Sequence, residues 1–314
     1  MILRLLDLHG MEEKSLMEMR GIFLTVIAAG VVVVAGSAYG EKLRVASLHP
    51  VATDLARRIG GDRVEVVEIV RSGGDPHHFE PGPSEIRAVA EARIVLAAGL
   101  GLESYLPKLM AATSGGPQYV LLGKSVKPLR FPATQGSVEM ADPHWWQSLS
   151  NVSAAARKIR DVFGEADPEG RDGYEARASA LLASLESLKE WAALEIASLP
   201  KSVRVLVTPH DGFGYFARDF GFVTIPLMDI KATNQPTPQR VSEIIAKMRA
   251  RGVRAVFAEQ GENPKALSEI MRETGARMGG ELIADGPGSG GVRTYEEMMR
   301  HNISTIVEAL RPAP

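Results

Sequence analysis

From residue 42 onward, short apolar runs with strand-like composition alternate with segments of helical periodicity. In the first half, the strand-like runs are residues 42–48, 64–70, 93–99 and 119–123, and the helix-like segments are residues 51–61, 84–92 and 102–112. This alternation is typical of layered α/β folds, in which helices connect parallel strands. We therefore expect an α/β protein with a mainly parallel sheet flanked by helices.

The alternation is interrupted by one long helical segment between Pro168 and Pro200. Its apolar residues recur every three or four positions, which is the period of an α-helix. They are Tyr174, Ala178, Leu181, Leu182, Leu185, Leu188, Ala192 and Ile196. A helix of about 28 residues is roughly 42 Å long, enough to run past a whole domain. We interpret residues 169–199 as a rigid helix that joins two lobes; the alternative is a long surface helix within one domain.

After Pro200 the alternation of strands and helices resumes. The strand-like runs are residues 203–208, 222–228, 254–260 and 281–285, and the helix-like segments are residues 213–221, 237–252, 263–275 and 294–311. A chain of 314 residues is long enough for two such lobes. We expect an N-terminal α/β lobe over residues 41–168 and a C-terminal α/β lobe over residues 200–314.

Residues 1–40 have the pattern of a secretory signal. Arg20 precedes an uncharged apolar run over residues 21–36, and small residues follow it. The apolar run is shorter than the about 20 residues of a membrane span. We therefore predict a cleaved signal peptide over residues 1–40; the alternative is a retained membrane anchor.

Composition limits the kinds of partner and site. The formal net charge is −2 and there is no basic stripe, which argues against nucleic-acid binding. The sequence contains no cysteine, so thiolate metal sites, disulfides and a cysteine-linked lipid are not expected. We expect a monomer that is soluble in the periplasm once the signal peptide is removed.

Three histidines and one aspartate are the strongest candidates for chemistry. His77, His210 and Asp285 follow predicted strands, where ligands bind in open α/β sheets, and His144 shares an Asp-Pro-His turn with His77. Three imidazoles and one carboxylate form a plausible four-coordinate site for a divalent transition metal. Consecutive members of this set are 67, 66 and 75 positions apart, which excludes a local zinc-finger site and favours a site assembled from both halves. Separately solvated loop histidines are the alternative.

Five segments of the sequence carry a family resemblance. They are "GGDPHHFEPGPSEI", "DPHWW", "TPHDGFGYFARDFG", "FAEQGENPKALSEIMRETGA" and "ADG…TYEEMMRHNI". In this order they closely resemble the zinc- and manganese-binding solute-binding proteins of bacterial ABC importers, the cluster A-I or cluster 9 family. The resemblance covers essentially the whole mature chain. It implies two α/β lobes, a rigid connecting helix and a metal held between the lobes by His77, His144, His210 and Asp285. It also implies a partner, the ABC transporter membrane permease that receives the metal ion.

The sequence departs from that family in three places. Residues 111–141 contain no histidine, although many zinc-uptake members have a histidine-rich loop there. Trp146, Gln147 and Ser148 replace a Leu-Asp-Pro-like run, so we expect a different cleft rim. Phe79 stands where tyrosine is common, which removes one hydroxyl near the site.

The ligand set favours Zn2+ over Mn2+, since imidazole suits zinc and carboxylate-rich sites suit manganese. Manganese preference stays open, because family members with this set also accept it. Each ligating imidazole should donate its other N–H to a carboxylate or carbonyl. The candidate acceptors are Asp75, Glu80, Asp142, Asp211 and Glu259, and the aromatic residues that either enclose the site or pack in the core are Phe79, Trp145, Phe213 and Tyr215.

We expect a periplasmic metal-binding protein and no enzyme. Four protein ligands leave no open position for a catalytic water, and the H-E-x-x-H and G-x-S-x-G motifs are absent. The alternatives are a metal-dependent hydrolase and an adhesin-like surface role. Of the remaining histidines, His78 is expected to be a bystander, His49 a cleft or packed residue, and His301 a surface or packed residue.

Overall fold

The computed structural model describes residues 41–131, 140–228, 236–261, 265–288 and 290–312. The predicted signal peptide lies outside the described residues. The chain from Lys42 onward forms one compact unit. Among the described residues, none of the helices combines the length and apolar character that crossing a membrane requires.

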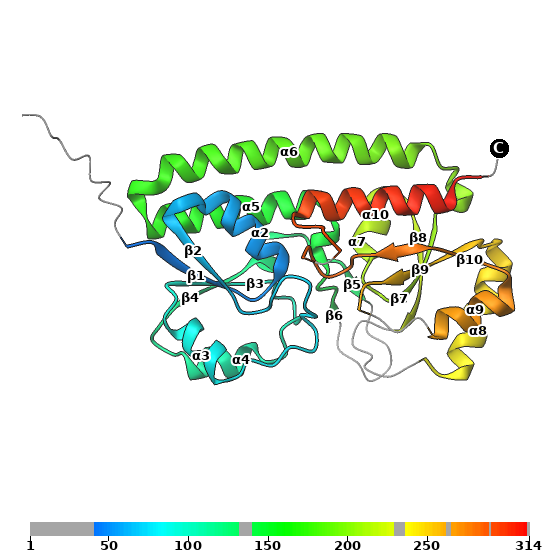
Figure 1. Cartoon of the computed structure of the whole chain (residues 1–314), viewed down its shortest axis with the longest axis horizontal. Coiled ribbons are helices and arrows are strands. Elements are labelled where there is room, and N and C mark those ends of the chain that lie inside the picture. The colour runs from blue at the N-terminus through cyan, green and yellow to red at the C-terminus, as the bar shows by residue number, and fades with distance from the viewer. Residues whose placement is uncertain (1–40, 132–139, 229–235, 262–264, 289, 313–314) are drawn as a thin grey trace, which may run out of the picture. The chain divides into compact units, whose positions relative to one another are not determined.

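The first half contains a four-stranded parallel sheet in the order β2-β1-β3-β4. Its strands are β1 (Leu43–Ser47), β2 (Val64–Glu68), β3 (Ile94–Ala97) and β4 (Gln118–Leu121). Val45 and Ala46 face opposite sides of the sheet and are both fully buried, because helices cover both faces. Figure 1 shows α2 (Pro50–Gly60) and α5 (Leu149–Ala166) above this sheet and α3 (Pro83–Ala90) and α4 (Leu106–Ala112) below it.

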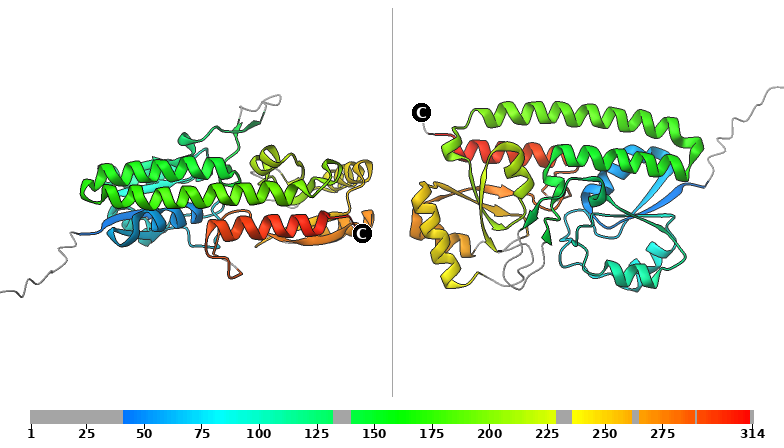
Figure 2. Two further views of the ribbon diagram at one scale, coloured as in Figure 1. Left: turned by 90° about the horizontal axis from the view of Figure 1, so that it is seen from above. Right: turned by 180° about the vertical axis from the view of Figure 1, so that it is seen from behind.

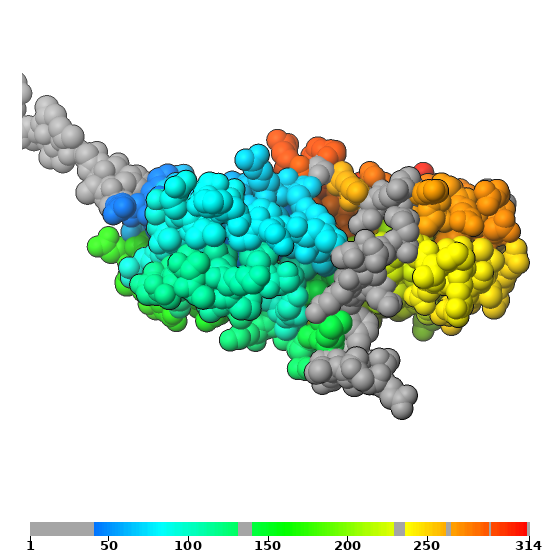
Figure 3. All heavy atoms as spheres, turned by 90° about the horizontal axis from the view of Figure 1, so that it is seen from below, coloured from blue at the N-terminus to red at the C-terminus, as the bar shows by residue number. Residues whose placement is uncertain are grey.

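The second half repeats the arrangement with two parallel strand pairs. β7 (Val205–His210) pairs with β8 (Val223–Met228), and β9 (Ala255–Glu259) pairs with β10 (Arg277–Leu282). The helices are α7 (Gly214–Phe220), α8 (Pro238–Arg251), α9 (Lys265–Thr274) and α10 (Tyr295–Leu310). Figure 3 shows the face of the molecule on which α3, α4, α8 and α9 lie.

Helix α6 (Arg171–Ala197, 27 residues) packs against α2 and α5 of the first half and α10 of the second half (Figures 1 and 2). Its buried residues are Tyr174, Ala178, Leu181, Leu185, Leu188, Ala192 and Ile196, which are the predicted stripe without Leu182. The largest apolar cluster runs from the first half to the second along this helix. The predicted α/β class with parallel sheets flanked by helices and a long helix is confirmed. The lobe boundaries near residues 168 and 200 stay a prediction.

Three strands differ from the expectation. A short antiparallel pair, β5 (Arg130–Phe131) and β6 (Met140–Ala141), was not predicted. The last strand was expected over residues 281–285, but β10 ends at Leu282. Leu282 makes the last backbone bond of the pair, because its carbonyl accepts from the Gln260 N–H at 3.0 Å. Ala284 would be the next residue to face β9, but its carbonyl accepts from the side chains of Trp146 and Gln147 instead.

Candidate metal centre

The four predicted residues meet at one place, two from each half of the chain. One potential ligand atom from each of His77, His144, His210 and Asp285 lies within 4.8 Å of those of the other three. His144 Nε2 is 3.2 Å from both His77 Nε2 and His210 Nε2, and His77 Nε2 is 3.3 Å from Asp285 Oδ1. The cluster is asymmetric in exposure, because the side chain of His144 is fully buried whereas that of Asp285 is 26% exposed.

His77 reaches the cluster from the loop between β2 and α3. The Asp75 carboxylate accepts a hydrogen bond from the backbone N–H of His77 at 2.7 Å, which fixes the Asp-Pro-His turn. The other carboxylate oxygen of Asp75 lies 2.6 Å from Nδ1 of His78. The His78 side chain is 57% exposed and faces Asp75, whereas the ring of His77 faces the cluster.

His144 is held by the second Asp-Pro-His turn, immediately before η3 (Trp145–Gln147). One oxygen of the buried Asp142 carboxylate accepts from both the backbone N–H and the ring Nδ1–H of His144, each at 2.9 Å. With Nδ1 protonated, the lone pair on Nε2 points at the other ligand atoms. Burial lowers the pKa of His144 despite the opposing hydrogen bond from Asp142, so the ring is neutral and able to bind a metal.

His210 is the last residue of β7, and Glu259, the last residue of β9, lies beside it. The Glu259 carboxylate accepts a short hydrogen bond from His210 Nδ1–H, so Nε2 of His210 carries the lone pair that faces the cluster. Glu259 is 2% exposed, and this burial raises the pKa of its carboxyl group. Strands β7 and β9 lie side by side, so their ends bring a histidine and its carboxylate partner together.

Asp285 lies three residues beyond β10. Burial alone would raise the pKa of Asp285, but the hydrogen bond with His77 and the nearby imidazoles outweigh burial and hold the pKa below its usual range. The Asp285 side chain is therefore an anion in the folded protein. A carboxylate of this kind is an oxygen ligand for a divalent cation.

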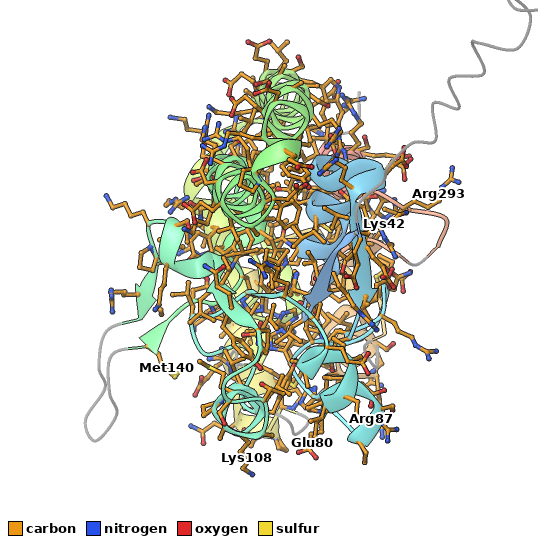
Figure 4. All side chains as sticks on the ribbon, turned by 90° about the vertical axis from the view of Figure 1, so that its left-hand side faces the viewer. Lys42, Glu80, Arg87, Lys108, Met140 and Arg293 are labelled. Atoms are coloured by element: carbon orange, nitrogen blue, oxygen red, sulfur yellow. The ribbon has the colours of Figure 1, made fainter. Side chains whose placement is uncertain are left out.

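Of the candidate acceptors, Asp142 and Glu259 bond to ligand rings. Asp75 instead bonds to a backbone N–H and to His78, and Glu80 is exposed at the outer edge of the molecule (Figure 4). Tyr215, one of the predicted aromatic residues, supports the site indirectly, because its hydroxyl donates to the Asp142 carbonyl at 2.8 Å.

Sequence reasoning missed the role of Trp146 and Gln147, which were expected at the cleft rim. Both side chains are fully buried. The Trp146 ring packs edge-on against His144, with centroids 5.2 Å apart, and lies 4.1 Å from the ring of His49. Their position directly after the Asp-Pro-His turn was the sequence feature that could have indicated a role next to His144.

Phe79, Trp145 and His49 pack rather than line the cluster. Phe79 packs edge-on against Tyr105, and Trp145 donates from its indole N–H to the Ala98 carbonyl at 3.1 Å. His49 is fully buried and its Nδ1 accepts from the Val51 N–H at 3.2 Å, which caps α2. Burial lowers the pKa of His49 to about 3, so its ring is neutral.

Part of the ligand-atom spacing matches that of a small tetrahedral ion. Ligand atoms at the 2.0–2.1 Å bond length of zinc to nitrogen are about 3.3–3.4 Å apart when arranged as a tetrahedron. Three of the six distances within the cluster, at 3.2, 3.2 and 3.3 Å, are close to this value, and all four atoms lie within 4.8 Å of one another. Two parallel-sheet halves joined by a long helix, with this cluster formed from both halves, define a metal-binding substrate-binding protein.

Comparison with known proteins gives the same class. Residues 45–309 match the family described as zinc-uptake complex component A, periplasmic, and the chain belongs to that family. The chain is 31% identical to the manganese-binding lipoprotein MntA of Halalkalibacterium halodurans, over 86% of this chain and 89% of the relative. It is 30% identical to the iron-binding protein YfeA of Yersinia pestis, over 85% and 86%.

Solved structures share the fold. The periplasmic zinc binding protein TroA from Treponema pallidum superposes with a TM-score of 0.80 at 26% identity, over 87% of this chain and all of that one. The Mn-bound periplasmic metal binding protein from Candidatus Liberibacter asiaticus gives a TM-score of 0.78 at 24% identity, over 86% of this chain and all of that one, a likeness that bears on the fold. The chain is thus a substrate-binding protein of an ABC metal transporter and not an enzyme.

Proposed function

We propose that this protein binds one divalent transition metal through His77, His144, His210 and Asp285 and delivers it to an ABC permease. The convergence of three imidazole nitrogens and one carboxylate oxygen within 4.8 Å of one another carries the proposal, since four such groups can bind one transition metal ion. Partner carboxylates on two of the three rings add to it, because metal-bound histidines generally donate their second N–H to such a group.

We further propose that residues 1–40 direct export and that the mature protein works in the periplasm as a soluble monomer. The description of the matched family as periplasmic supports this location. Several relatives are named lipoproteins, whereas this sequence contains no cysteine to carry a lipid. The proposed domain division is an N-terminal lobe over residues 41–168, a spine helix over residues 169–199 and a C-terminal lobe over residues 200–314.

Zinc is the proposed cargo, because three of the four ligands are imidazoles. Manganese is the second candidate. It is favoured by the carboxylate of Asp285 and by two relatives at 31% and 30% identity that are named manganese-binding lipoproteins. One relative is named for iron and one structural neighbour for zinc, so proteins of this fold are named for several metals.

Metal analysis of protein purified without added metal, followed by zinc and manganese titrations, tests the proposal. We expect about one zinc ion per chain in the tetrahedral site and loss of that ion in His144→Ala. His301→Ala is the matched control, because His301 is exposed and contacts the Glu281 carbonyl, away from the cluster. Undiminished metal binding in His210→Ala and Asp285→Ala would contradict the ligand assignment.

A further inference from the structure

Helix η3 begins directly after His144 and sends two side chains to the chain segment that carries Asp285. Trp146 Nε1–H donates to the Ala284 carbonyl at 2.7 Å, and Gln147 Nε2–H donates to the same oxygen at 2.6 Å. A carbonyl oxygen has two lone pairs, so this carbonyl has a full complement of donors. The peptide group that precedes Asp285 is therefore fixed from the first half of the chain.

Both hydrogen bonds are formed by fully buried side chains. Loss of a buried donor leaves the acceptor without water to replace it, so such bonds are costly to break. The Ala284–Asp285 peptide group is planar, so fixing its oxygen also fixes its nitrogen and limits where the Asp285 Cα lies.

The two polar atoms of the Gln147 amide differ in their contacts, and only Nε2 holds the Ala284 carbonyl. Its Oε1 is buried and has no hydrogen-bond partner among the described residues, while its Nε2 donates to the carbonyl. An acceptor facing a carbonyl oxygen at 2.6 Å would be repelled, so the amide orientation follows from the contact itself. A leucine of similar size would avoid the unpaired oxygen, but it would provide no donor. The donated hydrogen bond is thus the specific contribution of glutamine at this position.

The rest of the segment is held equally firmly. Asn302 of α10 takes the N–H and carbonyl of Ile283, immediately before Ala284. A Cβ atom at Gly286 would lie 2.8 Å from the Cβ of Pro50, so the chain on the other side of Asp285 packs closely against the first half. Asp285 follows a strand of the second half, yet first-half residues contact the chain on both sides of it.

We propose that Gln147, together with Trp146, is a positioning residue that fixes Asp285 relative to His144. η3 joins the two ligands, because His144 precedes its first residue and Gln147 is its last. His144 and Asp285 then form one rigid pair within the metal site. This inference rests on the proposed ligand set.

Gln147→Leu in the full-length chain tests the proposal. We expect metal affinity, measured by competition with a chelator, to fall roughly 10- to 100-fold, as for loss of other groups that orient a metal ligand. The loss should be larger for manganese than for zinc, because manganese depends more on the carboxylate. Unchanged affinity, or equal losses for both metals, would overturn the proposal.

A double-mutant cycle separates positioning from general damage to the fold. In an Asp285→Ala background, Gln147→Leu should change zinc affinity less than about twofold, because the ligand that it positions is gone. The same factor in both backgrounds would overturn the proposal. If zinc binding by Asp285→Ala is too weak to measure, the Gln147→Leu variant alone decides. A larger loss of affinity for manganese than for zinc indicates positioning, and equal losses indicate general damage to the fold.

Two controls make the outcomes distinct. Thr113→Val removes a buried hydroxyl that donates to the Leu109 carbonyl at 2.9 Å on α4, and it should leave metal affinity unchanged. If Asp285→Ala alone leaves affinity unchanged, the ligand assignment fails. If Asp285→Ala weakens binding and Gln147→Leu does not, only the positioning role fails.

Discussion

Asp75 and Asp142 occupy the same position in two Asp-Pro-His turns and use their carboxylates differently. Each accepts from the backbone N–H of its histidine two residues on, but only Asp142 also bonds to that histidine's ring. The second oxygen of Asp75 pairs with His78 instead. His77 and His78 are therefore unequal, because the ring of His77 faces the cluster and that of His78 is directed to Asp75.

The inequality of the two histidines is directly measurable. His77→Ala should weaken zinc binding by more than roughly 100-fold. Losing a ligand should cost more than losing a group that only orients a ligand, which typically lowers affinity about 10- to 100-fold. His78→Ala should change affinity less than about twofold, because its exposed ring pairs only with Asp75 among the described residues. Calorimetric titration of both variants gives the comparison, and equal losses would contradict the assignment of His77.

Metal affinity should depend on pH, because only a neutral imidazole can bind the metal. Protons compete with the metal, so affinity should fall as the pH drops below about 6.5, the usual pKa of histidine. Burial lowers the pKa of His144, so this ring stays neutral below that pH and the fall should be shallower than three ordinary histidines would give. Zinc titrations between pH 7.5 and 5 measure the slope, and a flat profile would speak against histidine ligands.

For single residues, the sequence identified those that meet and named their partners Asp142 and Glu259 only within an unranked set of five candidates. Strand ends and a repeated turn marked the four clustered residues as candidates, and the family resemblance implied them as the ligand set. Asp75 and Asp142 have the same local sequence, so only the tertiary structure shows that one reaches a ring and the other a neighbouring histidine. Trp146 and Gln147 were misplaced at the rim, because burial depends on the Ala284 segment that reaches them from 137 or more residues away.

Among the elements, helices and strands with a clear period were predicted well. Helix α8 is an example, because Thr237 caps its start and Gly252, with φ of 61°, ends it, as its sequence indicated. The end of β10 was not predictable from local sequence. The apolar run over residues 282–284 continues past the strand, and the hydrogen bonds that occupy the Ala284 carbonyl come from Trp146 and Gln147.

Helices α2 and α10 are joined by the partly buried carboxylate of Asp54, which affects stability. The Asp54 carboxylate accepts from the Tyr295 N–H at 3.0 Å, at the start of α10. Burial raises the pKa of Asp54 from 3.8 to about 6. The folded state therefore binds more protons than the unfolded state between these values, and Asp54 should make stability decrease as the pH rises from about 4 to 6.

Asp54→Asn keeps an oxygen acceptor for Tyr295 and removes the titration. Stability of the metal-free variant should depend less on pH between about 4 and 6 than that of the unaltered protein. Urea denaturation at several pH values measures this difference. Identical pH profiles for the two proteins would contradict the role given to Asp54.

For the whole molecule, a metal held by ligands from both halves should stabilise the folded state. Binding adds about 2.7 kcal/mol to the free energy of unfolding when free metal is 100 times its Kd. Thermal unfolding with and without zinc should show a rise in Tm that is lost in His144→Ala and kept in His301→Ala. A similar rise in both variants would indicate binding elsewhere.

The shared apolar cluster along α6 predicts cooperative unfolding. Leu185 and Leu188 are almost fully buried in the cluster that extends through both halves. Leu188→Ala should lower the free energy of unfolding by about 2–5 kcal/mol. Calorimetry should show one transition shifted as a whole; a variant with two separated transitions would mean that the halves unfold independently.

The position of α6 also constrains how the sequence can evolve. Helices α2 and α5 pack on it from one half and α10 packs on it from the other. A substitution on its buried face alters the surface that both halves must fit, so a compensating change in one half has to remain acceptable to the other. The two halves are therefore free to diverge in their loops, but along this helix they are bound to evolve together.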